Sequence, residues 1–116
     1  MLHEESNTQI AFVRWFRHEY PELAPLMFSV PNGGRRSKTT AAILKAEGVV
    51  AGVADMLFLV ARGKHHGLAL EFKTEQGRQS PAQKAWQQAV QKQGYCYAVV
   101  RSLDDAIDVT NLYLSL

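Results

Sequence analysis

Apolar residues recur at helical spacing near the start of the chain. Those that share this spacing are Leu2, Ile10, Val13, Phe16 and Tyr20. A recurrence every three or four positions is typical of an amphipathic helix, so the pattern predicts one over residues 4–20. Pro21 sets its end, because the residue before a proline avoids the helical region.

Short apolar runs separated by glycine and proline follow, and they predict strands. These runs cover residues 27–30, 56–60, 68–74 and 95–100. The turn at residues 61–67 joins the second run to the third as a hairpin. The length and β-branched content of the last run favour a buried position in the sheet.

Helix signals stand between and after these runs. A serine suitable as an N-cap precedes each predicted helix, at Ser37, Ser80 and Ser102. The first of these helices reaches Glu47. The second has Pro81 at its first position and Gln83 as a capping-box partner, and it stops before Gly94. The third is short, and residues 110–116 are expected to form a short strand or an extended tail.

The predicted order of elements is helix, strand, helix, hairpin, helix, strand and helix. A strand, helix and strand after the hairpin imply a parallel pair joined by a right-handed crossover. The predicted fold class is therefore α/β, with a mixed central sheet flanked by helices. A chain of 116 residues has the usual size of one domain, so we expect residues 1–116 to form a single domain.

Composition indicates the compartment of the chain more clearly than the reaction that it catalyses. Hydrophobic residues make up 47% of the chain, and the net charge of +2 gives only weak support for a nucleic-acid partner. The one cysteine, Cys96, permits no intrachain disulfide, which favours a reducing, cytoplasmic compartment. The acidic N-terminus does not resemble a signal peptide, and the apolar runs are too short to cross a membrane.

Three charged residues fall at one end of the predicted hairpin. Asp55 opens the first strand, while Glu71 and Lys73 lie two residues apart on the second and therefore share a face. Two carboxylates offer the hard oxygen ligands that Mg²⁺ or Mn²⁺ takes. Such a cation polarises a phosphoryl oxygen and acidifies a water, and a lysine stabilises developing charge. The pattern predicts metal-dependent phosphodiester hydrolysis.

A simpler interpretation of the same residues is an exposed Glu-x-Lys on a strand beside an unrelated turn aspartate. That interpretation is favoured for the tripeptide Glu71-Phe72-Lys73 alone. Its position in an apolar strand pair, after the Gly-x-x-Asp of residues 52–55, favours the catalytic interpretation instead.

The first helix carries an acid and an amide on its apolar face. At about 100° per residue, Glu5 and Gln9 fall on the same side as Val13. Polar groups on such a face need partners, and a metal site would supply them. The alternative is fraying at the chain start, which leaves Glu5 in water.

Gln83 also has two interpretations. It lies at the edge of the helix face that carries Trp86 and Val90, from which it would reach the active site or the DNA backbone. It is equally the capping-box partner of Ser80. We expect one glutamine to fill only one of these roles at a time.

A basic stretch follows the turn at residues 31–34. Arg35, Arg36 and Lys38 would contact DNA phosphates, or they would form an ordinary solvated loop. No Gly-Lys-Ser/Thr follows the glycine pair, so no nucleotide cofactor is expected.

A larger set of residues resembles a known family. The set comprises Glu5, Gln9, residues 31–35, 44–49, 52–55 and 71–73, Gly77, Ser80, Gln83 and Gly94. It spans almost the whole chain and closely resembles the VRR-NUC domain, in the standalone form found in phages and bacteria. Ala54 departs from the pattern, since the family often has proline there. Because a proline would only stiffen the turn, the departure does not argue against activity.

The resemblance implies a restriction-endonuclease-like PD-(D/E)xK core and structure-specific DNA cleavage with Mg²⁺ or Mn²⁺. We expect one metal to be held by Asp55, Glu71 and the backbone carbonyl of Phe72. Glu5 would contribute to a second metal, and Lys73 would serve the attacking water. Gln83 completes the expected catalytic set. The expected DNA contacts are Gln9, Asn32, Arg35, Arg36 and Lys38.

Standalone members resemble homodimeric Holliday junction resolvases, so we expect a symmetric homodimer that acts on branched DNA. Trp15 is the first candidate for the interface, followed by Phe12 and Leu26; the alternative is a monomer in which Trp15 packs under the Arg35 loop. One rival function is a nuclease directed at flaps, ends or plain duplex. Another is a catalytically idle DNA-binding subunit.

Overall fold

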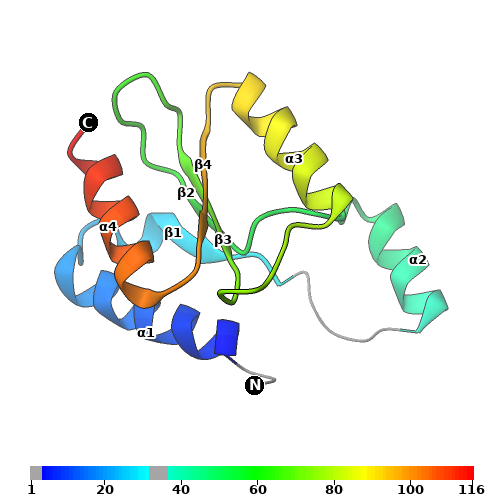
Figure 1. Cartoon of the computed structure of the whole chain (residues 1–116). Coiled ribbons are helices and arrows are strands. Elements are labelled where there is room, and N and C mark those ends of the chain that lie inside the picture. Colours follow the sequence, from blue (N-terminus) through cyan, green and yellow to red (C-terminus); the bar gives the residue numbers. More distant parts are fainter. Residues whose placement is uncertain (1–3, 32–36) are drawn as a thin grey trace.

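A computed structural model of the chain describes residues 4–31 and 37–116 (Figure 1). Its strands form one sheet in the order β1-β2-β3-β4. Their bounds are β1 (Met27–Ser29), β2 (Met56–Phe58), β3 (Leu68–Phe72) and β4 (Cys96–Val100). The first two pairings are antiparallel and the pairing of β3 with β4 is parallel, which confirms the mixed sheet.

Helices lie on both sides of this sheet. They are α1 (Glu4–Glu19), α2 (Lys38–Ala46), α3 (Pro81–Lys92) and α4 (Leu103–Leu114), with a 3-10 turn η1 (Ala24–Leu26). In Figure 1, α1 and α4 cover one face, α3 lies on the other, and α2 stands apart from the sheet. The α/β class is thus confirmed. None of the helices within residues 4–31 and 37–116 is long and apolar enough to cross a membrane.

The serines predicted as caps are found at the helix starts. The hydroxyl oxygens of Ser37, Ser80 and Ser102 accept hydrogen bonds from backbone N–H groups three residues further on. Each bond satisfies a donor that the first turn of a helix leaves free. These local signals explain why α2, α3 and α4 begin where the sequence predicted.

The main core fills the space between the sheet and the α1–α4 layer. Phe12 and Phe16 of α1 are fully buried against Phe58 of β2, with ring centroids 5.3–6.2 Å apart. Leu68, Leu70 and Phe72 of β3 join them, because alternate residues of a strand share one face. The apolar face expected for α1 is wrong at Ile10, which is 54% exposed.

The same packing corrects the interface prediction. Phe12 lies in the core and is not available to a partner. Trp15 packs partly buried at the edge of that core, against the rings of Phe12, Phe16 and Tyr20. Leu26 is 39% exposed and is the remaining member of the expected set.

Residues 110–116 were expected to be a strand or tail, and that prediction is wrong. They continue α4 as far as Leu114. Ala106, Thr110 and Tyr113 are spaced four and three residues apart and form its buried stripe. The Tyr113 hydroxyl donates a 2.6 Å hydrogen bond to the carbonyl of Val60, which fastens α4 to the chain after β2.

The final strand was expected to be buried, and this is confirmed in part, since Tyr97 and Val100 are buried and the other residues of β4 are half-buried. β4 lies at an edge of the sheet, next to β3. α3 covers its face of the sheet only loosely, because Trp86 and Val90 are half-buried while Ala82, Ala85 and Ala89 are exposed. An apolar groove of about 280 Å³ therefore stays open between α3 and the β2–β3 pair.

Candidate active site

Asp55 and Glu71 are brought together by strand register. The last β2–β3 pair is Met56 with Leu70, so one further step of the same register sets Asp55 opposite Glu71. Side chains directly opposite on neighbouring strands share a face and lie close together. The backbone carbonyl of Asp55 accepts a 2.8 Å hydrogen bond from Val30 N–H, and its Oδ2 accepts one of 2.7 Å from Phe72 N–H.

Glu71 is a buried acid, with only 2% of its surface exposed. Its Oε2 accepts a hydrogen bond from Gln83 Nε2 at 3.1 Å and lies 3.9 Å from Lys73 Nζ. The pKa of Glu71 is raised to about 8, first by burial and then by the neighbouring Asp55, while the charge of Lys73 acts in the opposite direction. Its other oxygen, Oε1, is buried without a hydrogen-bond partner among the described residues.

These features fit a divalent cation. A buried carboxylate oxygen without a partner costs free energy, and a second carboxylate beside it adds repulsion. A cation between Asp55 and Glu71 would relieve both. Within the described residues no three His, Cys, Asp or Glu side chains gather closely enough to hold a metal. The ligand set would therefore be two carboxylates completed by backbone carbonyl and water, which suits Mg²⁺.

Gln83 fills both of its expected roles, and the prediction that it would fill only one is wrong. Its Oε1 accepts a 2.8 Å hydrogen bond from the N–H of Ser80, while its Nε2 donates to Glu71. A backbone N–H is only a donor, so it fixes the amide oxygen toward Ser80 and the NH₂ group toward the acid. The capping box of α3 thereby orients a partner of Glu71.

Gly52 explains how α3 comes so close to Asp55. Its φ is +86°, and a Cβ at this position would lie 2.3 Å from the carbonyl oxygen of Ala82 and 2.8 Å from the nitrogen of Gln83. Only glycine permits this approach without moving α3. The glycine of the Gly-x-x-Asp pattern therefore sets the distance between Asp55 and the first turn of α3.

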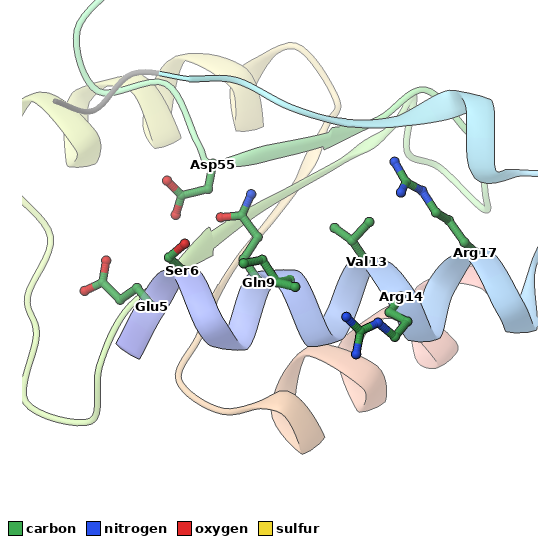
Figure 2. Close-up of a pocket in the computed structure, with 8 residues that line it drawn as sticks. Glu5, Ser6, Gln9, Val13, Arg14, Arg17 and Asp55 are labelled. Carbon is green, nitrogen blue, oxygen red and sulfur yellow. The ribbon is translucent and has the colours of Figure 1, made fainter. Parts of the chain in front are cut away.

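The first turns of α1 lie on another side of Asp55. Figure 2 shows Ser6 and Gln9 directed toward Asp55, with Glu5 beside them, and these residues line a pocket of about 590 Å³. Glu5 is exposed, and of the causes that shift the pKa of Glu71 its charge is the smallest. Glu5, which was expected on the apolar face of this helix, therefore faces solvent at the rim of the site.

Some of the predicted site residues do not lie beside Asp55 and Glu71. Lys38 is exposed at the start of α2, and no hydrogen bond or ion pair joins it to the described site residues. Asn32, Arg35 and Arg36 lie outside the described residues, so their expected DNA contacts stay predictions. The sequence interpretation missed Arg14 and Arg17, which line the α1 pocket with Asp55. Arg17 lies eight residues after Gln9, on the same face of the predicted helix, and that spacing was the available signal.

Comparisons with known proteins identify the family of the chain. The family model of the VRR-NUC domain matches residues 3–104. A solved structure described as a VRR_NUC domain protein is 30% identical and superposes with a TM-score of 0.86, covering 97% of this chain and 88% of that chain. Among curated proteins, none matches the chain significantly. A nuclease-type function acting on DNA follows from the family, and the chain belongs to the VRR-NUC domain family.

Proposed function

We propose that the chain is a Mg²⁺- or Mn²⁺-dependent endodeoxyribonuclease that cuts branched DNA as a homodimer, in the manner of a Holliday junction resolvase. The observation that carries the catalytic part is the pair of acids at the β2–β3 end. Glu71 is buried beside Asp55, and its Oε1 has no partner among the described residues. Such an arrangement is costly in an empty site and suited to a bound cation.

Each site residue has a distinct role in this proposal. Asp55, Glu71 and the Phe72 carbonyl would hold one metal, and Glu5 would contribute to a second. When bound, a divalent cation polarises the phosphoryl oxygen and lowers the pKa of a water. Lys73, with its Nζ 3.9 Å from Glu71, would orient the attacking water and stabilise the charge that develops on the phosphate.

The proposed homodimer has a better surface than the one first expected. The apolar groove between α3 and the β2–β3 pair is bordered by Leu59 and Tyr95, which are 57% and 38% exposed. Phe28 on β1 is 40% exposed. Contiguous apolar surface of this kind marks a protein contact, and twofold pairing is the commonest closed assembly.

Dimerisation also supports the preference for four-way junctions. Resolution of a junction needs two cuts on symmetry-related strands, whereas each chain has one candidate site. A twofold dimer presents two such sites in fixed geometry. It also doubles the phosphate contacts of a chain whose net charge is only +2.

A cleavage panel tests the proposed function. Labelled four-way junction, flap and linear duplex DNA would each be incubated with the chain in Mg²⁺, in Mn²⁺ and in EDTA. We expect cleavage in either metal, none in EDTA, and the highest rate on the junction. Equal rates on junction and linear duplex would contradict the branch preference and favour a duplex-directed nuclease. Binding without cleavage of any substrate would contradict the enzymatic function.

A further inference from the structure

The pocket along α1 extends well beyond the acids. From the Asp55 end it continues past Gln9 and Val13 to Arg14 and Arg17 (Figure 2). Gln9, Val13 and Arg17 are four residues apart and follow one side of the helix, and Arg14 lies next to that side, one position after Val13. From Gln9 to Arg17 the helix rises about 12 Å, at about 1.5 Å per residue. The groove therefore runs parallel to α1, starting at the candidate metal site.

Acidic and basic residues lie at opposite ends of this groove. Its acidic members, Glu5 and Asp55, stand at one end, and its basic members, Arg14 and Arg17, stand at the other. In the described ranges the one ion pair joins Lys73 to Glu71, so no carboxylate there neutralises either arginine. Both arginines are exposed. Two unneutralised guanidinium groups beside an acidic metal site are complementary to an anionic polymer that passes over the metal.

The helix dipole explains the position of only one of the two arginines. Arg17 lies in the last turn of α1, where a cation favours the helix dipole. Arg14 lies before that turn and gains little from the dipole. Ile10 lines the groove beside Arg14 and is 54% exposed, which supplies an apolar surface next to the charge. Guanidinium groups with apolar surface beside them suit a chain of phosphates joined by sugars.

We propose that the groove along α1 binds the phosphodiester backbone on one side of the cleaved bond, with Arg14 and Arg17 contacting successive phosphates. This inference rests on the proposed nuclease function and adds the path of the DNA strand. A duplex rises about 3.4 Å per nucleotide, so the groove length corresponds to about three to four nucleotides. Neither arginine is placed at the reacting atoms, so both act in binding.

The test is the salt dependence of DNA binding, measured without cleavage. A fluorescein-labelled duplex would be titrated with the chain in EDTA over a range of NaCl concentrations. Arg14→Ala and Arg17→Ala should each reduce the slope of log affinity against log salt by about 0.9, and the double variant by about twice that. Arg14→Lys with Arg17→Lys keeps both charges and should keep the slope.

A matched pair of variants controls for the loss of net charge. Lys64 and Lys92 are exposed and do not line the groove, so the double variant Lys64→Ala with Lys92→Ala should keep the slope. A slope unchanged by the arginine substitutions, or reduced equally by the lysine substitutions, would overturn the inference while unsubstituted chain still binds and cuts DNA. Failure of the unsubstituted chain to bind DNA would overturn the proposed function as well.

Discussion

The amide of Gln83 binds Ser80 through its oxygen and Glu71 through its nitrogen. Substitutions at Gln83 and at Ser80 should therefore have different effects on cleavage. Gln83→Ala removes the capping partner of Ser80 and the donor to Glu71, whereas Ser80→Ala removes only the hydroxyl of the cap. Both variants should lose stability on the order of 1 kcal/mol. Loss of the partner that orients a metal ligand commonly costs about 10- to 100-fold in activity, which we expect for Gln83→Ala alone.

Thermal unfolding and single-turnover cleavage of the two variants check this prediction side by side. Equal, small losses of cleavage in both would mean that Gln83 serves only the helix cap.

The raised pKa of Glu71 predicts a pH-dependent stability in the absence of metal. Its pKa is about 8 in the folded chain, against 4.5 for an unperturbed glutamate. The folded state thus binds the proton more tightly, so this contribution to stability is complete below about pH 4.5 and is lost as the pH rises to about 8. The loss amounts to a few kcal/mol at most, at about 1.4 kcal/mol per pKa unit.

Glu71→Gln isolates this contribution, because glutamine resembles the protonated acid. In EDTA, urea unfolding should give similar stabilities for the two chains near pH 5 and a more stable variant near pH 8. Parallel stability curves across this range would show that Glu71 does not titrate as described.

At the scale of elements, the approach of α3 to the Asp55 turn depends on Gly52. Gly52→Ala would strain a positive φ, at about 1 to 2 kcal/mol, and would also place a Cβ against the backbone of Ala82. Gly48 is a matched control, because its φ is +106° but nothing lies within 4 Å of the added Cβ. We expect Gly48→Ala to lose stability only, and Gly52→Ala to lose more stability and most of its cleavage.

Thermal unfolding followed by circular dichroism, together with cleavage rates of the two alanine variants, tests this prediction. Retention of full cleavage by Gly52→Ala would show that the position of α3 is unimportant to the site.

The element pattern also shows what the sequence could predict. The order of elements and the pairing of Asp55 with Glu71 followed from alternation, turn signals and capping serines, all of which act locally. The end of α4 was missed because the spacing of Ala106, Thr110 and Tyr113 was overlooked, although it is helical. The edge position of β4 depends on which strands pair, and its apolar composition does not reveal that.

The site was predictable to a similar extent. Asp55, Glu71 and Lys73 carry their chemistry in their spacing, whereas Arg14 and Arg17 become part of the site only because α1 crosses the sheet beside Asp55. The double role of Gln83 was missed because an amide has two distinct ends and the sequence interpretation gave it one partner.

At the scale of the whole molecule, the apolar groove between α3 and the β2–β3 pair predicts the dimer interface. Leu59→Lys places a charge at a position that is 57% exposed in one chain, so folding should be little affected while pairing weakens. Leu112→Lys on α4 is the control, because Leu112 is 68% exposed and does not line this groove. We expect Leu59→Lys to give a monomer and to lose paired junction cuts.

Light scattering across micromolar concentrations reports the mass of each variant directly. A dimeric Leu59→Lys chain would place the interface elsewhere, and a monomeric parent chain with full junction cleavage would refute the dimer itself.

The central claim is that two carboxylates hold a catalytic metal, and Asp55→Asn tests it most directly. Asparagine keeps size and an oxygen that can accept from Phe72 N–H, but it lacks the charge that a hard cation needs. Metal-dependent cleavage should fall by more than about 100-fold, the upper loss expected for a residue that only orients a ligand. Metal-free stability should hold or rise, most clearly above pH 8, where Glu71 is charged and its repulsion by Asp55 is removed. Cleavage by the folded Asn variant at the parent rate in Mg²⁺ would contradict the account.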